Sequence, residues 1–169
     1  MSVQTTYSTN MSAAFAGMRA SFNAGDVVVP MRNNEASAEI AFGRAVKYEG
    51  LTDDDGALLP TAESSKIAGI VMHRHGYTVG SNGELGTSGL KPGAIMEVMQ
   101  RGEIWVTVED AVVPGDKLWV RGVAGGDPEF LGGLLPADDS TDTVDCTNFG
   151  TFRTTAAAGG LAKLQIHFV

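Results

Sequence analysis

The chain has 169 residues, a formal net charge of −8 at pH 7, 22 glycines and one cysteine. This length suffices for one domain with a substantial core. The charge argues against nucleic acid as a partner, because phosphate binding requires a basic patch and the sequence has none. No apolar run approaches the ~20 residues of a membrane-spanning helix, so we expect no membrane partner. A single thiol offers no intrachain disulfide.

The first eighteen residues contain no Asp, Glu, Lys or Arg and consist mainly of small and polar residues. Such a segment is too polar to build a core, yet it lacks the charge that is typical of a solvated disordered tail. We therefore interpret residues 1–25 as an arm that packs along the surface of another protein. Within it, residues 10–19 have the spacing of a short helix, with Met11, Phe15 and Met18 on one face.

Residues 26–169 read as a body of short β-type runs separated by turn residues. The runs cover 27–29, 40–48, 67–75, 94–108, 117–121 and 161–169. In 94–108 we expect two strands that meet in a turn at 100–102, where Gly102 can take a positive φ. No amphipathic helix of ten or more residues separates the runs. This favours a mainly β fold, a single antiparallel β-barrel or sandwich (jelly-roll-like or β-tulip-like), over a βαβ fold.

An acidic, Gly-rich segment at 122–150 interrupts this pattern. Between Arg121 and Arg153 there is no basic residue. The segment holds six acids, which are Asp127, Glu129, Asp138, Asp139, Asp142 and Asp145. We expect a long acidic loop between two strands, since long loops on a β scaffold are commonly functional.

The sequence shows no constellation that we interpret as an active site. His73 and His75 share a strand face, but a zinc site needs further ligands and the only other histidine is His167. The Asp-rich stretches 53–55 and 138–145 lack the spacing of an EF-hand loop. Cys146 has no neighbouring base or cation to activate it. We therefore predict no catalytic residue, no cofactor and no metal, and expect that the protein is not an enzyme.

Trp105 leaves two interpretations open. Alternation places it opposite Ile104 and Val106, on the polar side of its strand. If that side is exposed in the monomer, the ring is available to an interface, where burying it would contribute about 2 kcal/mol or more. If both sides of the sheet are covered, Trp105 is ordinary core.

Several short motifs in chain order resemble the structural cement (capsid decoration) proteins of tailed bacteriophages. They are the opening MSVQTTYS, the small-residue stretch 13–17, IAFGRAV at 40–46, IAGI at 67–70, GEIWV at 102–106 and VVPGD at 112–116. The acidic segment 122–150 matches nothing in that resemblance. The family implies a β-rich protein bound to the outer surface of the phage head, made in the host cytoplasm.

The resemblance further implies that the chain bridges neighbouring major capsid proteins and stabilises their lattice. Its partners would be the major capsid protein and itself, with a homotrimer preferred and a homodimer second. We expect the capsid or partner interface to include Val3, Gln4, Thr5, Tyr7, Met11, Phe15, Met18 and Trp105. Two other function classes stay open. One is a carbohydrate-binding or host-adhesion module using Trp105, Tyr77 and Tyr48, and the other is a metal-dependent enzyme using His73, His75 and Asp116.

Overall fold

Short β-strands dominate the computed structural model, which describes residues 14–50, 55–73, 89–123 and 131–169. The strands are β1 (Val27–Asn33), β2 (Ile40–Ala41), β3 (Ala45–Tyr48), β4 (Gly56–Leu58), β5 (Ile67–Val71), β6 (Gly89–Leu90), β7 (Ile95–Thr107), β8 (Trp119–Arg121), β9 (Leu134–Leu135), β10 (Thr143–Asp145), β11 (Gly150–Phe152) and β12 (Leu161–His167). One 3-10 turn, η1 (Ser140–Asp142), precedes β10. The prediction of a mainly β fold is confirmed.

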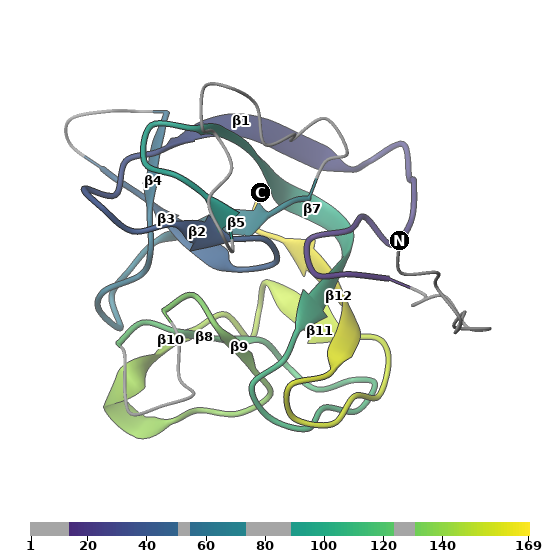
Figure 1. The fold of residues 1–169 in the computed structure, drawn as a ribbon. Helices are drawn as coiled ribbons and strands as arrows, with labels where there is room; N and C mark the ends of the chain where they lie inside the picture. The colour runs from purple at the N-terminus through teal and green to yellow at the C-terminus, as the bar shows by residue number, and fades with distance from the viewer. Residues whose placement is uncertain (1–13, 51–54, 74–88, 124–130) are drawn as a thin grey trace, which may run out of the picture.

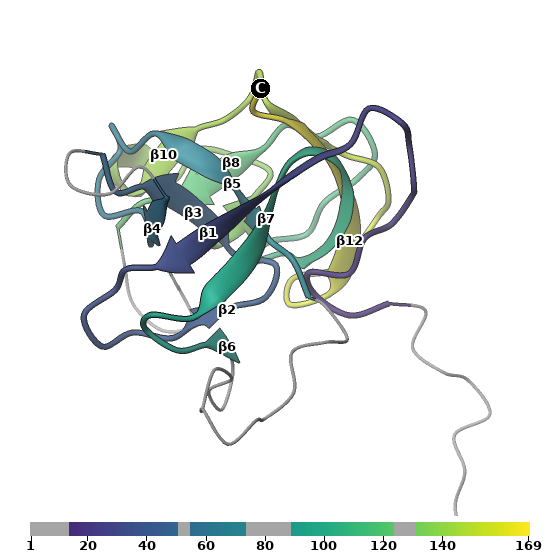
Figure 2. The ribbon, with the colours of Figure 1, turned by 90° about the horizontal axis from the view of Figure 1, so that it is seen from above.

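Five strands close into a barrel. Their order is β1-β4-β3-β5-β7, and β1 also pairs with β7, which completes the ring (Figure 2). Four of the five contacts are antiparallel, whereas β1 and β4 run parallel. The predicted barrel is therefore confirmed, with one parallel pair where we expected only antiparallel ones.

Strand β7 extends beyond the barrel and organises the rest of the molecule (Figure 1). Its first half pairs with β1 and β5, and its second half pairs with β12, from Arg101↔His167 to Thr107↔Leu161. β11 then pairs with β12. A second sheet of order β10-β8-β9 lies below the barrel in this view.

Two hydrophobic clusters follow from the alternation of side chains along the shared strands. Met96 and Val98 of β7 belong to one cluster with Val46 and Val71. Met99 and Ile104, further along the same strand, belong to a larger cluster that includes Leu118, Val120, Phe152 and Leu164. Because β7 contributes to both clusters, it joins the barrel to the β8–β12 half of the molecule.

The prediction of a turn at 100–102 is wrong. β7 is continuous through Gly102, which has φ 140° and pairs with Ile166 of β12. The positive φ that we expected at Gly102 is confirmed, and a Cβ there would in addition lie 3.0 Å from both the Asp26 carboxyl and the Met99 sulfur. Close approach of neighbouring groups, rather than chain reversal, requires glycine in this strand.

The helix that we expected at 10–19 is also absent from its described part, 14–19. The chain there turns at Gly17, which has φ 81°, and then runs beside β7. The backbone groups of residues 17–20 bond to β7, so hydrogen bonds within a helix are replaced by bonds to a neighbouring strand. Residues 10–13 lie outside the described residues.

The acidic segment 122–150 is more regular than the loop that we expected. Its described part contributes β9, η1 and β10, and β8 pairs with both strands. Leu134, Leu135 and Val144 are buried there. Burial of these apolar residues stabilises the acidic segment as part of the second sheet.

Candidate functional site

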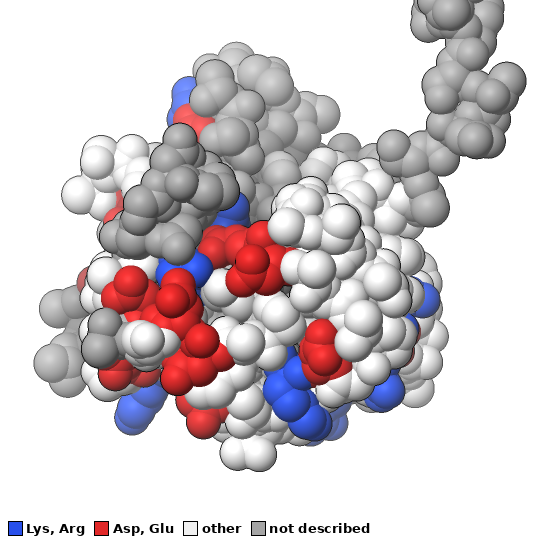
Figure 3. Space-filling model, turned by 90° about the horizontal axis from the view of Figure 1, so that it is seen from below, with Lys and Arg blue, Asp and Glu red and all other residues white. Residues whose placement is uncertain are grey.

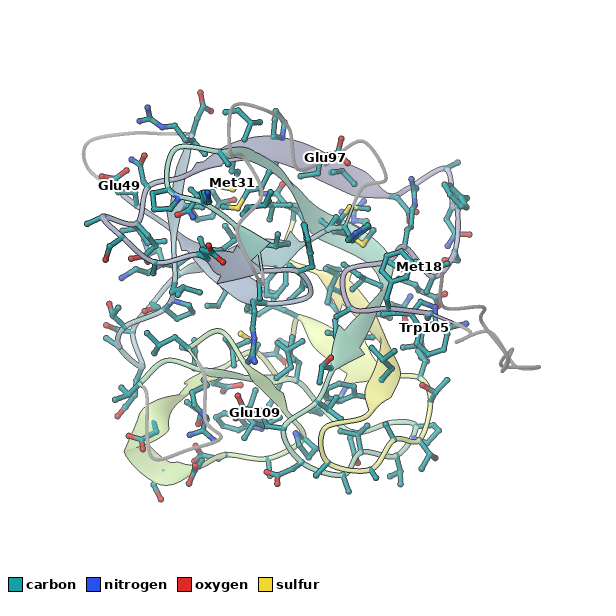
Figure 4. The ribbon with its side chains drawn as sticks, in the orientation of Figure 1. Met18, Met31, Glu49, Glu97, Trp105 and Glu109 are labelled. Atoms are coloured by element: carbon teal, nitrogen blue, oxygen red, sulfur yellow. The ribbon has the colours of Figure 1, made fainter. Side chains whose placement is uncertain are left out.

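The described end of the N-terminal segment, residues 14–20, lies against the second half of β7; we call it the arm root. The Gly17 amide donates to the Trp105 carbonyl at 2.8 Å, and the Trp105 amide donates to the Met18 carbonyl at 2.8 Å. The Ala20 amide donates to the Glu103 carbonyl at 2.8 Å. These three bonds make the arm root an added strand on β7, opposite to β12, and Figure 4 shows Met18 close to Trp105.

A second set of contacts holds the arm root from the barrel side. The His73 amide donates to the Gly17 carbonyl at 2.8 Å. The rings of Phe15 and Phe42 each meet the His73 ring edge-on, with centroids 4.5 Å and 4.7 Å away. Edge-to-face pairs at such distances are favourable. The point where the N-terminal segment leaves the body is therefore held on two sides.

Trp105 falls between the two interpretations that the sequence left open. Its side chain is half-buried, while Ile104 and Val106 beside it are fully buried. Lys163, its cross-strand partner on β12, places its ammonium 5.5 Å from the centre of the indole ring, within cation–π range. Trp105 is therefore neither closed core nor an open platform.

The structure brings together three of the interface residues predicted from the sequence: Phe15, Met18 and Trp105 meet through the arm root. Val3, Gln4, Thr5, Tyr7 and Met11 lie outside the described residues. The sequence analysis did not single out Phe22, a residue that is 84% exposed. Its neighbours Ser21 and Asn23 are turn-forming residues, and an aromatic between them was a signal that it would not be core.

An ion-pair cluster connects the barrel to the second sheet. Arg121 on β8 donates from Nε to Glu109 at 2.8 Å and from Nη1 to Asp139 at 2.9 Å. Arg44, just before β3, reaches the other oxygen of Glu109 at 3.4 Å. Burial lowers the pKa of Arg44, and the attraction of Glu109 opposes this shift. Figure 4 shows Glu109 in the lower half of the molecule, and acidic side chains gather on that face in Figure 3.

The described residues contain no group of three or more His, Cys, Asp or Glu side chains that could hold a metal ion. His75, Asp53 and Asp54, which the sequence raised as ligands, lie outside them. Cys146 is buried, and this burial, aided by Asp145, raises the pKa of its thiol to about 12. The thiolate that nucleophilic chemistry requires is therefore strongly disfavoured.

The aromatic rim required by the glycan-binding alternative is not seen in the part of the chain that is described. The Tyr48 hydroxyl is engaged by the Gln100 side chain, which donates to it at 2.7 Å. Tyr77 lies outside the described residues. Separately, none of the helices in the described parts is long and apolar enough to cross a membrane.

Comparison with known proteins identifies the family of the chain. The sequence matches the family of structural cement proteins (E217 gp24/Pam3 gp6) over residues 3–167. The chain therefore belongs to the phage structural cement protein family, which is structural rather than enzymatic and which implies association with the capsid.

Solved structures support the fold independently. A chain from "The capsid of Myoviridae Phage XM1" superposes with a TM-score of 0.68, at 20% sequence identity and over 100% of both chains. At that identity the likeness concerns the fold. No curated protein matches the sequence.

Proposed function

We propose that this protein binds the outer surface of a phage head, bridges neighbouring major capsid proteins and stabilises their lattice. The family match over residues 3–167 carries this proposal. It is supported by the arm root, which fixes the uncharged N-terminal segment to one side of a compact body. The role is mechanical, and no bond is made or broken.

The N-terminal segment provides the reach that bridging requires. An extended chain spans at most about 3.3–3.6 Å per residue, so the residues ahead of Gly17 reach about 55 Å. The first eighteen residues contain no Asp, Glu, Lys or Arg, which lowers the cost of removing them from water. We propose that Val3, Gln4, Thr5, Tyr7 and Met11 contact a neighbouring capsid subunit, and that Phe15, Met18 and Trp105 form the part of the interface next to the body.

Lattice stabilisation follows from repeated modest contacts. In an oligomer each bound copy raises the effective concentration of the next one at its own site, so weak contacts become durable together. We propose a cyclic homotrimer first and a homodimer second, since both are common closed assemblies. Synthesis in the host cytoplasm and assembly onto the outside of the head complete the proposal.

Co-sedimentation with phage heads that lack the decoration protein tests the proposal. The full chain should pellet with heads at a fixed, saturable ratio, and heads that carry it should withstand heating better than bare heads. A variant without residues 1–13 keeps the arm root and should stay folded but remain in the supernatant. A full-length variant with Val3, Tyr7 and Met11 replaced by Ser keeps the reach and should also bind poorly.

These variants separate the parts of the proposal. If the full chain does not bind heads, the cement function is wrong for this protein. Undiminished binding by the truncated variant would remove the arm from the mechanism while leaving the body as the binding element.

A further inference from the structure

A short loop between the arm root and β1, residues 21–26, presents the most exposed large apolar side chain in the described part of the protein. Phe22 has 84% of its surface exposed. Single exposed apolar residues are common on protein surfaces, so exposure alone assigns nothing. The surroundings of Phe22 are what distinguish it.

The loop is held in one conformation by charged and polar contacts. Arg19 forms an ion pair with Asp26, whose side chain is only 4% exposed, and its Nε also donates to the Ser21 carbonyl at 3.0 Å. The Asn23 amide donates to the Asp26 carboxylate at 3.2 Å, and the Asp26 amide donates to the Asn23 carbonyl at 3.1 Å. Asp26 in turn lies over Gly102 of β7, where a larger residue would collide with it.

The same arginine positions the aromatic ring. The Arg19 guanidinium carbon lies 4.4 Å from the centre of the Phe22 ring, a cation–π contact. One face of the ring therefore rests on a side chain that is itself anchored by Asp26, while most of the ring remains in water. Holding an aromatic residue in place before binding removes most of the ordering cost that a mobile side chain would have to overcome.

We propose that Phe22 is an anchor that inserts into an apolar pocket of the capsid subunit on which the arm lies. This inference rests on the proposed function and names a contact that the arm alone does not supply. The ring rests on Arg19, and its neighbours in sequence, Ser21 and Asn23, are polar. An exposed aromatic among polar residues has the composition of an interface hot spot, in which an aromatic anchor is bordered by a polar rim.

The size of the contact shows that Phe22 acts as part of a larger interface. Complete burial of an aromatic side chain covers about 150–250 Å², whereas a stable specific interface buries about 1,200–2,000 Å² in total. Phe22 alone can therefore hold neither a second copy of this chain nor a capsid subunit. It can serve as one anchor in a larger interface. Because Ala20 is hydrogen-bonded to Glu103, two residues from Trp105, Phe22 lies next to the arm root, whose residues Phe15 and Met18 we propose to contact the capsid subunit. The capsid subunit is therefore the partner that this inference assigns to Phe22.

Binding curves on undecorated heads test the proposal, with the full chain and the variant Phe22→Ala. We expect the variant to need at least a tenfold higher concentration for half-saturation, the usual effect of losing a hot spot. Phe22→Trp should bind almost as well as the original chain. Ile95→Ala is the matched control, because Ile95 is also large, apolar and 59% exposed but lies at the other end of the β1–β7 pair.

Each possible result of these binding curves either supports or overturns the role of Phe22 as an anchor. Because Phe22 is exposed, Phe22→Ala should keep the thermal stability of the full chain, so weakened binding would reflect the lost contact and not misfolding. Equal binding of Phe22→Ala and the full chain would overturn the proposal while leaving the cement function intact. A change in oligomer mass on Phe22→Ala would assign the ring to contacts between copies and overturn it as well. Failure of the full chain itself to bind would reject the cement function first.

Discussion

The Arg121 guanidinium is 3% exposed and donates a 2.8 Å hydrogen bond to the Glu109 carboxylate, which is itself 14% exposed. Arg121 belongs to β8 of the second sheet, and Glu109 follows the end of β7. Arg44, next to barrel strand β3, binds the other oxygen of the same carboxylate. Glu109 therefore joins two arginines from different parts of the fold, and it fixes the second sheet against the barrel.

Replacing Glu109 with Gln should lower the free energy of unfolding by about 3 kcal/mol, because removing one partner of a buried ion pair leaves an uncompensated charge. Asp139, which also pairs with Arg121, is 49% exposed at its side chain, and such exposed pairs contribute at most about 1 kcal/mol. Urea unfolding measures the change. The control is Glu63→Gln, an exposed carboxylate, which should change stability by less than about 0.5 kcal/mol. Equal effects of the two substitutions would contradict the bridging role of Glu109.

The ion pairs of Glu109 occupy the space that a side chain at position 133 would fill, so this position requires glycine. A Cβ at this position would lie 1.7 Å from Glu109 Oε1 and 2.8 Å from Arg44 Nη1. Glu109 cannot move aside without breaking its bonds to the arginines, so Gly133→Ala should destabilise the protein by about 2–3 kcal/mol. Gly25→Ala, where a Cβ meets nothing within 4 Å, is the control and should be nearly neutral. Thermal unfolding of the two variants side by side provides the measurement.

Cys146 should be inert to thiol reagents while the protein is folded. The pKa of its buried thiol is about 12, so only about one molecule in ten thousand carries the thiolate at pH 8. A colourimetric thiol reagent should react with it only after denaturant is added. Rapid labelling of the folded protein at pH 8 would show that the site is open.

The raised pKa of the Cys146 thiol makes the free energy of unfolding depend on pH. The thiol pKa is higher in the folded state than its ordinary value of 9.0. The unfolded chain therefore loses this proton first, and stability falls as the pH rises from about 9 to 12. The contribution is complete below pH 9. Unfolding curves of the original chain and of Cys146→Ala, compared across this range, isolate it, since the variant should lack this part of the decline.

The mainly β fold could be predicted from the sequence because the strands carry local signals. Alternating Ile104, Val106 and Val108 are all fully buried, as period-2 spacing indicates. The continuity of β7 through Gly102 could not be predicted, because glycine marks a turn and a close approach equally well in one sequence. The distinction depends on Asp26 and Ile166, which are distant along the chain.

The contacts of the candidate site could not be predicted for the same reason, because they join residues that are distant along the chain. Phe15 and Met18 have helical spacing, yet the hydrogen bonds available on β7 outweigh that weak local preference at a segment containing Gly17. The pairing of Met18 with Trp105 is a long-range contact that no spacing encodes. Phe22 is prominent only because Arg19 and Asp26 hold its loop, and their ion pair is likewise invisible before the chain is folded.

The attachment of the arm root to the body depends on Gly17. This residue has φ 81°, and a Cβ on it would lie 2.7 Å from the His73 backbone nitrogen and 3.1 Å from that of Gly43. Because backbone atoms cannot move aside, Gly17→Ala should lift the arm root from β7, and hydrogen exchange at the Trp105 and His73 amides should accelerate more than tenfold. Gly159→Ala is the matched control, since φ there is 74° but a Cβ meets nothing within 4 Å. It carries the same backbone strain without the collision, and should leave the exchange at both amides unchanged. Unaltered exchange in Gly17→Ala would show that the arm root is held by contacts other than these hydrogen bonds.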